Sequence, residues 1–206
     1  MVDVIELDLF YDYSCPFVYR MTKLIDAVGR SGQRNLKVRW RFFSLTQVNH
    51  RSEDPDDAWT VWTAPESESV RGRLAFKAAE AARRQGTFDA FHMALLDARH
   101  NDRADIESEA VIEGVARTAG LDLQRFQRDL ADPEILAALS RDHREAREVH
   151  GVFGTPTLVF PSGAAYVRLA HVVPDPEAVR VFDHIAGTVE GEPAVLEIKR
   201  PVRPSA

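Results

Sequence analysis

The sequence predicts an α/β fold in which a long helical segment separates two groups of strands. Alternating apolar residues at 4–10 and at 37–43 indicate strands on either side of a helix. Residues 66–150 carry helical patterns, and the β-branched run at 157–160 then indicates a return to strand. The expected order is therefore strand, helix, strand, a helical region, and a final group of strands with one helix.

The first helix is expected over residues 16–30, because apolar residues recur there at steps of three and four. Pro16 fits its first turn, where the N–H that proline lacks would have no helical partner anyway. Gly29 and Gly32 are expected to end it. Two strands joined by one helix form a right-handed parallel unit, and such a unit opens the predicted fold.

A loop is expected over residues 46–65, and its length indicates a functional or partly helical segment. We expect this loop to lie close to Cys15, at the end of the first strand. Trp59 and Trp62 would either line a substrate pocket there or cap the core between two lobes. Capping is the commoner role, because buried aromatic residues mostly pack.

Helices are expected to follow one another through the middle of the chain. Thr87 and Asp105 are predicted N-caps, and Asp132 followed by Pro133 is a strong start signal. Gly120 and Gly151 are expected to end helices. The predicted helices cover residues 66–84, a stretch after Thr87, 105–119, 122–130 and 132–150.

The C-terminal part returns to strands. After the strand at 157–160, a tight turn leads into an antiparallel strand at 164–169, and a last helix is expected over 174–186. The tail, 189–206, contains a short apolar alternation that predicts an extended strand.

Composition argues against several classes of partner. The chain has 206 residues, 45% of them hydrophobic, which suffices for one compact unit or two closely packed ones. A net charge of −6 argues against nucleic acid or an anionic membrane as the main partner. No apolar run approaches the length of a membrane span, and no signal peptide is visible. A single cysteine and no export signal predict a cytoplasmic protein.

The only cysteine, Cys15, stands between the first strand and the first helix. At such a junction, free backbone N–H groups and the positive end of the helix dipole favour a thiolate. Most lone cysteines are inert, so it is the position of Cys15 that supports reactivity. We therefore interpret Cys15 as a candidate nucleophile.

A second feature is the segment 151–160, in which a turn punctuated by glycines leads through Thr155 and Pro156 into a strand. X–Pro bonds adopt the cis form at modest energy, and a cis proline usually sits in a tight turn. Taken alone, an ordinary proline at the entrance of a strand explains the segment equally well. Ahead of a cis proline, the backbone N–H and C=O of Thr155 would be free to pair with an extended thiol peptide.

Together these two motifs resemble the DsbA-like family of thioredoxin-fold proteins. Cys15-Pro16-Phe17-Val18 matches the position of the family's Cys-x-x-Cys motif, with Cys15 as the nucleophile, and Gly154-Thr155-Pro156-Thr157 matches its cis-proline loop. The resemblance extends to FrnE-like and mycothiol-dependent reductases, kappa-class glutathione transferases and 2-hydroxychromene-2-carboxylate isomerases.

The resemblance implies an α/β, thioredoxin-like fold with an inserted all-helical domain. On this basis residues 1–55 and 151–206 are expected to form the thioredoxin-like domain, and residues 56–150 the helical insert.

The chain departs from the family pattern at Val18, which stands where the family has its second cysteine. Because the chain has no other cysteine, an intramolecular disulfide and a dithiol cycle within one chain are excluded. Monothiol chemistry remains: Cys15 would attack a disulfide or an electrophile, and an external thiol would resolve the adduct. Kappa-class and isomerase relatives carry serine at this position, so the chain matches neither branch fully.

Residues beside the two motifs are predicted to bind a substrate or a small thiol: Pro16, Phe17, Thr155, Pro156 and Asp12. The Asp12 carboxylate would either shuttle a proton or fix the loop through an Asx-turn, and loop fixing is the commoner role.

Charged residues elsewhere give weaker signals. Arg20, Arg39 or Arg41 could anchor a carboxylate, and His143 or His150 could face the Cys15 cleft. No metal site is predicted, because the chain has neither paired cysteines nor a His-x-x-x-His spacing. A nucleotide cofactor has no support either, since no glycine-rich phosphate loop is present.

The leading hypothesis is a cytoplasmic thiol–disulfide oxidoreductase-like protein with one nucleophilic cysteine. It would hold no cofactor tightly and would use a low-molecular-weight thiol, mycothiol or glutathione, as co-substrate. The expected partners are small-molecule or peptide thiols and disulfides, with neither nucleic acid nor membrane, and a homodimer is left open.

Two alternatives remain. One is an enzyme similar to kappa-class glutathione transferases or 2-hydroxychromene-2-carboxylate isomerases, in which Cys15 only hydrogen-bonds the sulfur of the small thiol. The other is a non-catalytic thioredoxin-fold binding protein.

Overall fold

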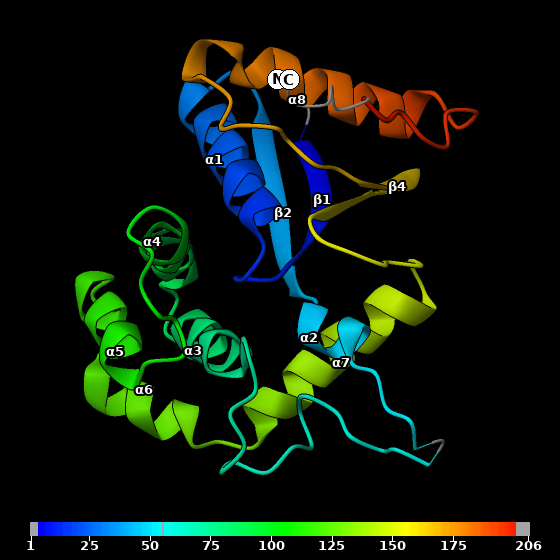
Figure 1. Cartoon of the computed structure of the whole chain (residues 1–206). Coiled ribbons are helices and arrows are strands. Elements are labelled where there is room, and N and C mark those ends of the chain that lie inside the picture. The colour runs from blue at the N-terminus through cyan, green and yellow to red at the C-terminus, as the bar shows by residue number, and fades with distance from the viewer. Residues whose placement is uncertain (1–3, 55, 201–206) are drawn as a thin grey trace, which may run out of the picture.

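The computed structural model describes residues 4–54 and 56–200, which contain a four-stranded sheet in the order β2-β1-β3-β4 (Figure 1). Strand β1 (Val4–Tyr11) pairs in parallel with β2 (Asn35–Phe42) and antiparallel with β3 (Thr157–Phe160). Strand β3 pairs antiparallel with β4 (Gly163–Tyr166). The sheet therefore joins the two ends of the chain, as the order of elements in the sequence predicts.

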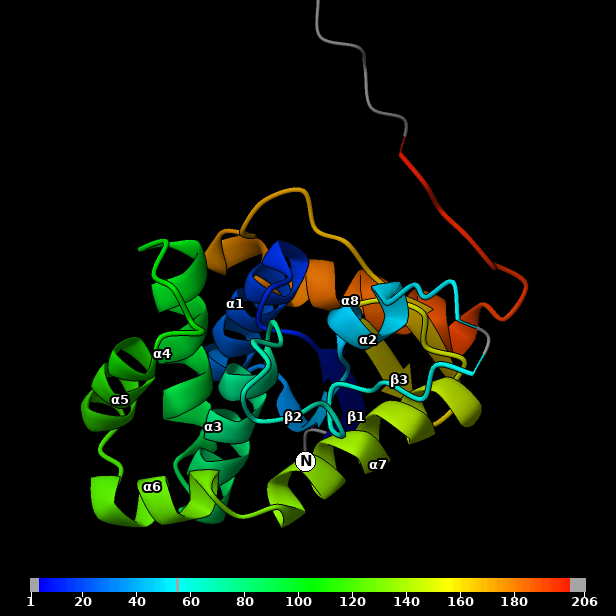
Figure 2. The same cartoon turned by 60° about the horizontal axis from the view of Figure 1, so that its bottom comes forward.

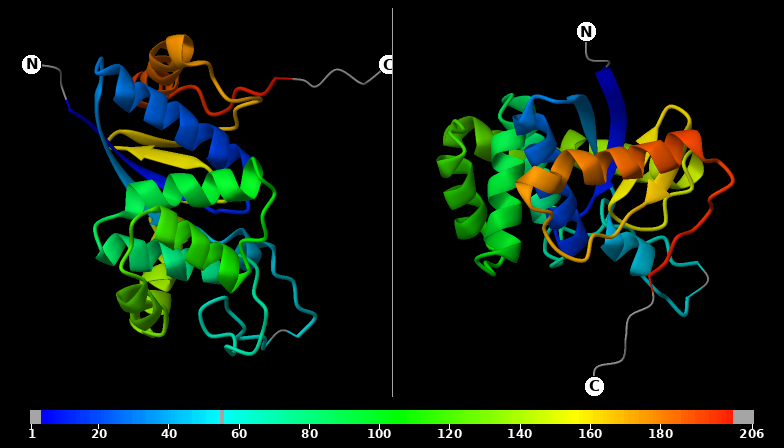
Figure 3. Two further views of the ribbon diagram at one scale, coloured as in Figure 1. Left: turned by 90° about the vertical axis from the view of Figure 1, so that its left-hand side faces the viewer. Right: turned by 90° about the horizontal axis from the view of Figure 1, so that it is seen from above.

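Side chains alternate across β1, and the two sets are buried in different clusters. Leu7, Leu9 and Tyr11 belong to the main core, which also contains residues of α1 (Pro16–Ser31) and α8 (Asp175–Gly191). Phe10 instead packs with residues that follow β2 and α7, in a second cluster that includes Ala146. Helices α1 and α8 lie against each other, as Figure 3 shows, and share the main core on one face of the sheet, while Ala146 of α7 packs with Phe10 on the other face.

Helix α1 begins where the sequence predicts. Its N-cap is Cys15, with extended backbone angles (φ −88°, ψ 116°), and Pro16 occupies the first turn. Gly32 ends the helix in the left-handed region at φ 67°, a conformation that favours glycine. The second predicted stop, Gly29, lies within the helix.

The helices between β2 and β3 form a group beside the sheet (Figure 2). The last of them, α7, contacts β2. They are α2 (Leu45–Asn49), α3 (Arg73–Arg84), α4 (Phe88–His100), α5 (Glu109–Thr118), α6 (Leu123–Leu130) and α7 (Glu134–Glu148). The domain limits at 55/56 and 150/151 stay a prediction.

Two helices start later than predicted. The helix expected from residue 66 begins at Arg73, because the Arg73 guanidinium holds the preceding turns through the carbonyl oxygens of Ala64, Pro65 and Glu68. The helix expected from Asp105 begins after Ser108, because the Asp105 carboxylate accepts from the Glu107 N–H in a local turn.

The C-terminal part differs most from expectation. Strand β4 stops at Tyr166, and α8 continues to Gly191, past the predicted end at residue 186. The strand predicted in the tail is wrong for the described residues: after α8, Leu196 is 95% exposed and Ile198 is 75% exposed, without regular structure. Val189, the first residue of that tail, lies in α8 instead and packs against the main core. The parts of these predictions at 1–3, 55 and 201–206 lie outside the described residues.

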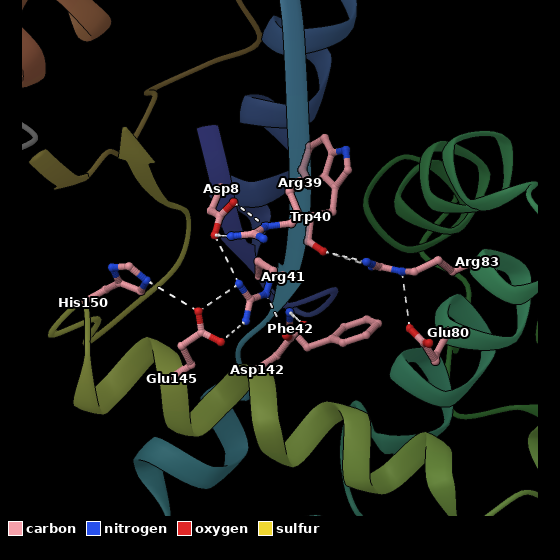
Figure 4. A network of polar contacts seen from close by, with 10 residues as sticks. All are labelled: Asp8, Arg39, Trp40, Arg41, Phe42, Glu80, Arg83, Asp142, Glu145 and His150. Atoms are coloured by element: carbon pink, nitrogen blue, oxygen red, sulfur yellow. Dashed lines mark hydrogen bonds and ion pairs between the residues drawn. The ribbon is translucent and has the colours of Figure 1, made fainter. Parts of the chain in front are cut away.

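A buried cation links the sheet to the helices (Figure 4). The Arg41 side chain is 8% exposed and pairs with Asp8 at 3.2 Å and with Asp142 and Glu145 at 2.6 Å each. Asp142 also accepts the backbone N–H of Phe42 at 3.0 Å. Because these carboxylates come from β1 and α7, the network fixes α7 against the strands.

Candidate functional site

The two sequence motifs meet at Cys15. Its Sγ donates a hydrogen bond to the carbonyl oxygen of Thr155 at 3.2 Å, and its backbone N–H donates to the Asp12 carbonyl at 3.0 Å. The Thr155–Pro156 peptide bond is cis. Cys15 is 5% exposed, so the thiol lies just below the surface at the N-terminal end of α1. In this position the helix dipole acts directly on the sulfur.

The Cys15 side chain lines a cavity of about 470 Å³. This volume falls within the range of roughly 300–1,000 Å³ that is typical of small-molecule sites. The structure brings three predicted residues to the wall of this cavity, Pro16, Phe17 and Thr155, while Pro156 is buried behind them. The wall is completed by Ser14, Leu45, Thr46, Val48, Asn49, Arg71, Phe153, Gly154 and Tyr166.

Asp12 lies beneath the cavity and is 1% exposed. Its Oδ1 accepts from the backbone N–H and the hydroxyl of Ser14, at 2.8 and 2.7 Å, and its Oδ2 accepts from the Leu45 N–H at 2.8 Å. Burial raises the pKa of the Asp12 carboxyl, and the hydrogen bonds from Leu45 and Ser14 oppose that rise. This geometry favours the loop-fixing role, because the carboxylate ties the Cys15 loop to the start of α2.

The two histidines considered for the cleft lie elsewhere. His143 is buried, and its Nδ1 accepts the backbone N–H of Ser44 at 3.1 Å, while burial lowers its pKa to about 4. His150 packs over the Phe10 ring at 5.8 Å. Neither residue lines the Cys15 cavity, because α7 covers the opposite side of β1.

The loop tryptophans also lie away from the thiol. Trp59 stacks on His50 with ring centroids 4.3 Å apart, and Trp62 lines a separate cavity of about 420 Å³ against α7. Both pack against a small cluster formed by Val61, Ala64 and Val70. Neither tryptophan lines the Cys15 cavity, and both pack on this small cluster, which is separate from the main core, while Trp62 also lines the second cavity.

The three arginines proposed as anchors are occupied within the chain. Arg39 and Arg41 pair with the carboxylate of Asp8, and Arg20 donates to the Leu169 carbonyl at 2.8 Å. None of the three lines the Cys15 cavity.

Sequence reasoning missed several residues of the cavity wall. Helix α2 contributes four of them, and its N-cap, Ser44, accepts from the Gln47 N–H in a pattern that the sequence could have revealed. Tyr166 reaches the wall from β4 and lies so close to Gly154 that a Cβ there would meet its Cε2 at 3.2 Å. Arg71 was expected within the helix predicted over 66–84, and nothing in that pattern distinguished it from the other charged residues of the segment.

Two further observations concern other classes of function. Within residues 4–54 and 56–200, no cluster of three or more histidine, cysteine, aspartate or glutamate side chains is arranged to hold a metal ion. In the same part of the chain, no helix combines the length and apolarity needed to cross a bilayer.

Comparison with known proteins gives one family. The family model described as "DSBA-like thioredoxin domain" matches residues 6–174. A curated relative, the ClpXP adapter protein SpxH of Bacillus subtilis, is 28% identical over 183 residues, which cover 76% of this chain. The match spans only 58% of the length of that relative.

Solved structures show the same fold. A probable DsbA oxidoreductase from Streptomyces coelicolor superposes with a TM-score of 0.61 at 18% identity, covering 97% of this chain and 93% of the other. A 2-hydroxychromene-2-carboxylate isomerase gives a TM-score of 0.61 at 12% identity, covering 88% of this chain and 95% of the other. The predicted α/β thioredoxin-like fold with a helical insert is thereby confirmed.

Proposed function

This chain belongs to the DSBA-like thioredoxin domain family, and on that premise we propose that it is a thiol–disulfide oxidoreductase-like enzyme whose nucleophile is Cys15. The observation that carries the proposal is the position of Cys15 Sγ, at the N-terminal end of α1 and on the wall of a 470 Å³ cavity, 3.2 Å from the Thr155 carbonyl oxygen. A reactive thiol needs access to its substrate, which the cavity supplies, and the place of Cys15 at the N-terminal end of α1 supports its choice as the nucleophile.

The proposed reaction is thiol–disulfide exchange. The Cys15 thiolate attacks one sulfur of a substrate disulfide, the S–S bond breaks, and the other sulfur leaves as a thiolate with the bonding electron pair. The product on the enzyme is a mixed disulfide. A thiolate from a low-molecular-weight thiol then attacks the substrate-derived sulfur and releases Cys15 as a thiolate. Each step replaces one S–S bond by another, so the cycle needs no second cysteine and no further oxidant.

The residues around Cys15 have separate tasks in this proposal. The carbonyl of Thr155 accepts a hydrogen bond from the protonated thiol and so holds Sγ at the cavity before reaction. Phe17 and Tyr166 supply the apolar wall against which a substrate would pack. Asp12 and Ser14 hold the loop that carries the sulfur. A compartment that keeps a lone thiol reduced, such as the cytoplasm, suits the cycle.

Cys15→Ser and Cys15→Ala test the proposal. Purified protein would be assayed with bis(2-hydroxyethyl) disulfide in the presence of glutathione or mycothiol, and the adduct would be followed by mass spectrometry. We expect the wild-type protein to form a mixed disulfide and to turn over, and both variants to fall to the uncatalysed rate. Thermal unfolding of the variants shows whether they are folded. A wild-type protein without turnover contradicts the proposal.

A second candidate function follows from the curated relative. Because the Bacillus subtilis protein is named as a ClpXP adapter, a non-catalytic, protein-binding role is the alternative that the 28% identity supports. Binding of the ClpX protein from the same host, measured by size-exclusion chromatography, would then be the same for the wild-type protein and for Cys15→Ser.

The isomerase-like alternative is separated by the same variants. In such an enzyme the small thiol is itself the reagent, and residue 15 only hydrogen-bonds its sulfur. Cys15→Ser would then keep substantial isomerase or transferase activity, because the serine hydroxyl can still donate a hydrogen bond to the sulfur of the small thiol. Cys15→Ala would lose this activity, because alanine has no donor.

A further inference from the structure

The wall of the Cys15 cavity carries a basic side chain, although the chain as a whole has a net charge of −6. Among the described residues, Arg71 is the only charged side chain on the cavity wall, and no aspartate or glutamate lines it. Two further arginines stand close by, since the guanidinium carbons of Arg168 and Arg20 lie 4.4 and 5.2 Å from the centre of the Phe17 ring. An acidic protein thus presents a basic side chain where the proposed substrate would bind.

Arg71 is exposed, yet its backbone is fixed from both sides. The Thr46 hydroxyl donates to the Arg71 carbonyl at 2.9 Å, and the next N–H, of Gly72, donates to Glu107 Oε1 at 2.6 Å. Gly72 has φ 84°, a left-handed conformation that favours glycine and turns the chain into α3. The guanidinium therefore extends from a fixed point on the wall of the cavity.

Two buried carboxyl groups are influenced by the charge of Arg71 without forming an ion pair with it. The charge of Arg71 acts on Asp12 and Glu107, lowering the pKa of both carboxyls against the larger effect of burial, which raises it. The Asp12 oxygens accept from Ser14 and Leu45, and Glu107 accepts from Gly72. Among the described residues, neither approaches the Arg71 guanidinium within 4.0 Å, which leaves its N–H groups available to a ligand.

We propose that the Cys15 cavity selects thiols that carry a carboxylate, and that Arg71 is the residue that binds this group. A guanidinium binds a carboxylate through paired N–H donors in a fixed, planar arrangement. Glutathione carries carboxylates at both ends, whereas mycothiol carries none. The inference rests on the proposed function and narrows its co-substrate to glutathione-type thiols and their disulfides.

Binding at equilibrium tests the inference without turnover. In the Cys15→Ser background, calorimetry would compare reduced glutathione with its dimethyl ester, which keeps the peptide and removes the carboxylates. We expect the acid to bind at least tenfold more tightly than the ester. Arg71→Gln should weaken binding of the acid by about ten- to a hundredfold, the effect of losing a charged hydrogen bond, and should leave the ester unchanged.

Arg144→Gln is the matched control, because Arg144 is an exposed arginine on α7 that lines the other cavity. It makes the same change in net charge and is expected to leave glutathione binding unchanged. Equal binding of the acid and the ester, no measurable binding of either, or equal losses in Arg71→Gln and Arg144→Gln would each overturn the inference.

Turnover separates this inference from the proposed function. If wild-type protein reduces bis(2-hydroxyethyl) disulfide but discriminates between charged and uncharged disulfides no better than Arg71→Gln does, the exchange chemistry stands and the carboxylate site is refuted. If wild-type protein binds glutathione through Arg71 but exchanges no disulfide, the carboxylate site stands and the proposed reaction is refuted.

Discussion

The thiol of Cys15 lies 3.2 Å from the carbonyl oxygen of Thr155, although 140 residues separate them in the chain. This one hydrogen bond joins the segment after β1 to the segment before β3, so the cavity forms only when these two neighbouring strands are paired. The carbonyl oxygen of Thr155 is hydrogen-bonded, but its side-chain hydroxyl is buried and has no hydrogen-bond partner in the structure.

We expect Thr155→Val to stabilise the protein by about 1 kcal/mol, because a methyl group replaces a buried hydroxyl that makes no hydrogen bond. Thr157→Val is the matched control. Its hydroxyl is also buried but donates to the Gly154 carbonyl at 2.8 Å, so its loss should destabilise by about 1–2 kcal/mol. Urea unfolding measures both. Equal changes in the two variants would show that the Thr155 hydroxyl is not unpaired in solution.

We expect Asp12→Ala to destabilise the protein by about 3 kcal/mol, because it leaves the buried N–H of Leu45 and the groups of Ser14 without their acceptor. Asp12→Asn should lower the stability by less, since the amide oxygen can still accept a hydrogen bond either from Ser14 or from the Leu45 N–H. If Asp12 only fixes the loop, Asp12→Asn will keep the shape of the pH–rate profile for disulfide exchange. Loss of one limb of that profile would instead show that Asp12 transfers a proton.

We expect stability to fall as the pH is lowered from about 6.5 towards 3. Burial lowers the pKa of His92 from 6.5 to about 3, so between these values the unfolded chain binds a proton that the folded chain does not. The contribution of His92 is therefore complete above pH 6.5 and is lost progressively below it. His143, with its pKa lowered to about 4, acts in the same direction.

His92→Phe tests this pH dependence. The variant also leaves the Tyr13 hydroxyl without the His92 Nδ1 partner at 2.9 Å, so its stability at neutral pH should drop as well. The informative quantity is the slope of unfolding free energy between pH 4 and 6.5 (roughly the interval between the two pKa values), which we expect to be shallower in the variant. Identical slopes in the two proteins would refute the assignment to His92.

We expect Arg41→Ala to destabilise the protein by roughly 3–5 kcal/mol, because it leaves Asp8, Asp142 and Glu145 facing one another without their shared cation. Lys37→Ala removes a pair with Glu6 in which both side chains are more than half exposed, and it should change stability by less than about 1 kcal/mol. Guanidinium chloride also screens ion pairs, so urea is the denaturant for this comparison. Similar losses in both variants would contradict the role of the Arg41 network.

Local signals in the sequence placed the elements that surround the thiol. Alternation of apolar residues marked β1, Pro16 marked the first turn of α1, and Gly32 marked its end. The helix predicted over 122–130 likewise forms as α6, with Asp122 as its N-cap. These features depend on neighbours within a few residues, so the sequence contains all the information that they require. The absence of a second cysteine, which limits the chemistry to one thiol, is also a property of the sequence alone.

Tertiary structure decided which side chains meet at the cavity. Arg71 and Tyr166 reach its wall from a turn before α3 and from β4, and the patterns that predicted a helix and a strand there did not show that either residue faces the thiol. The start of α3 at Arg73 is set by hydrogen bonds to carbonyl oxygens of the preceding turns, which compete with continued helix. Such contacts arise from the pairing of distant segments, and their energies depend on burial and charge that exist only in the folded chain. For that reason the sequence could identify the thiol, but only the fold could show the charge that surrounds it.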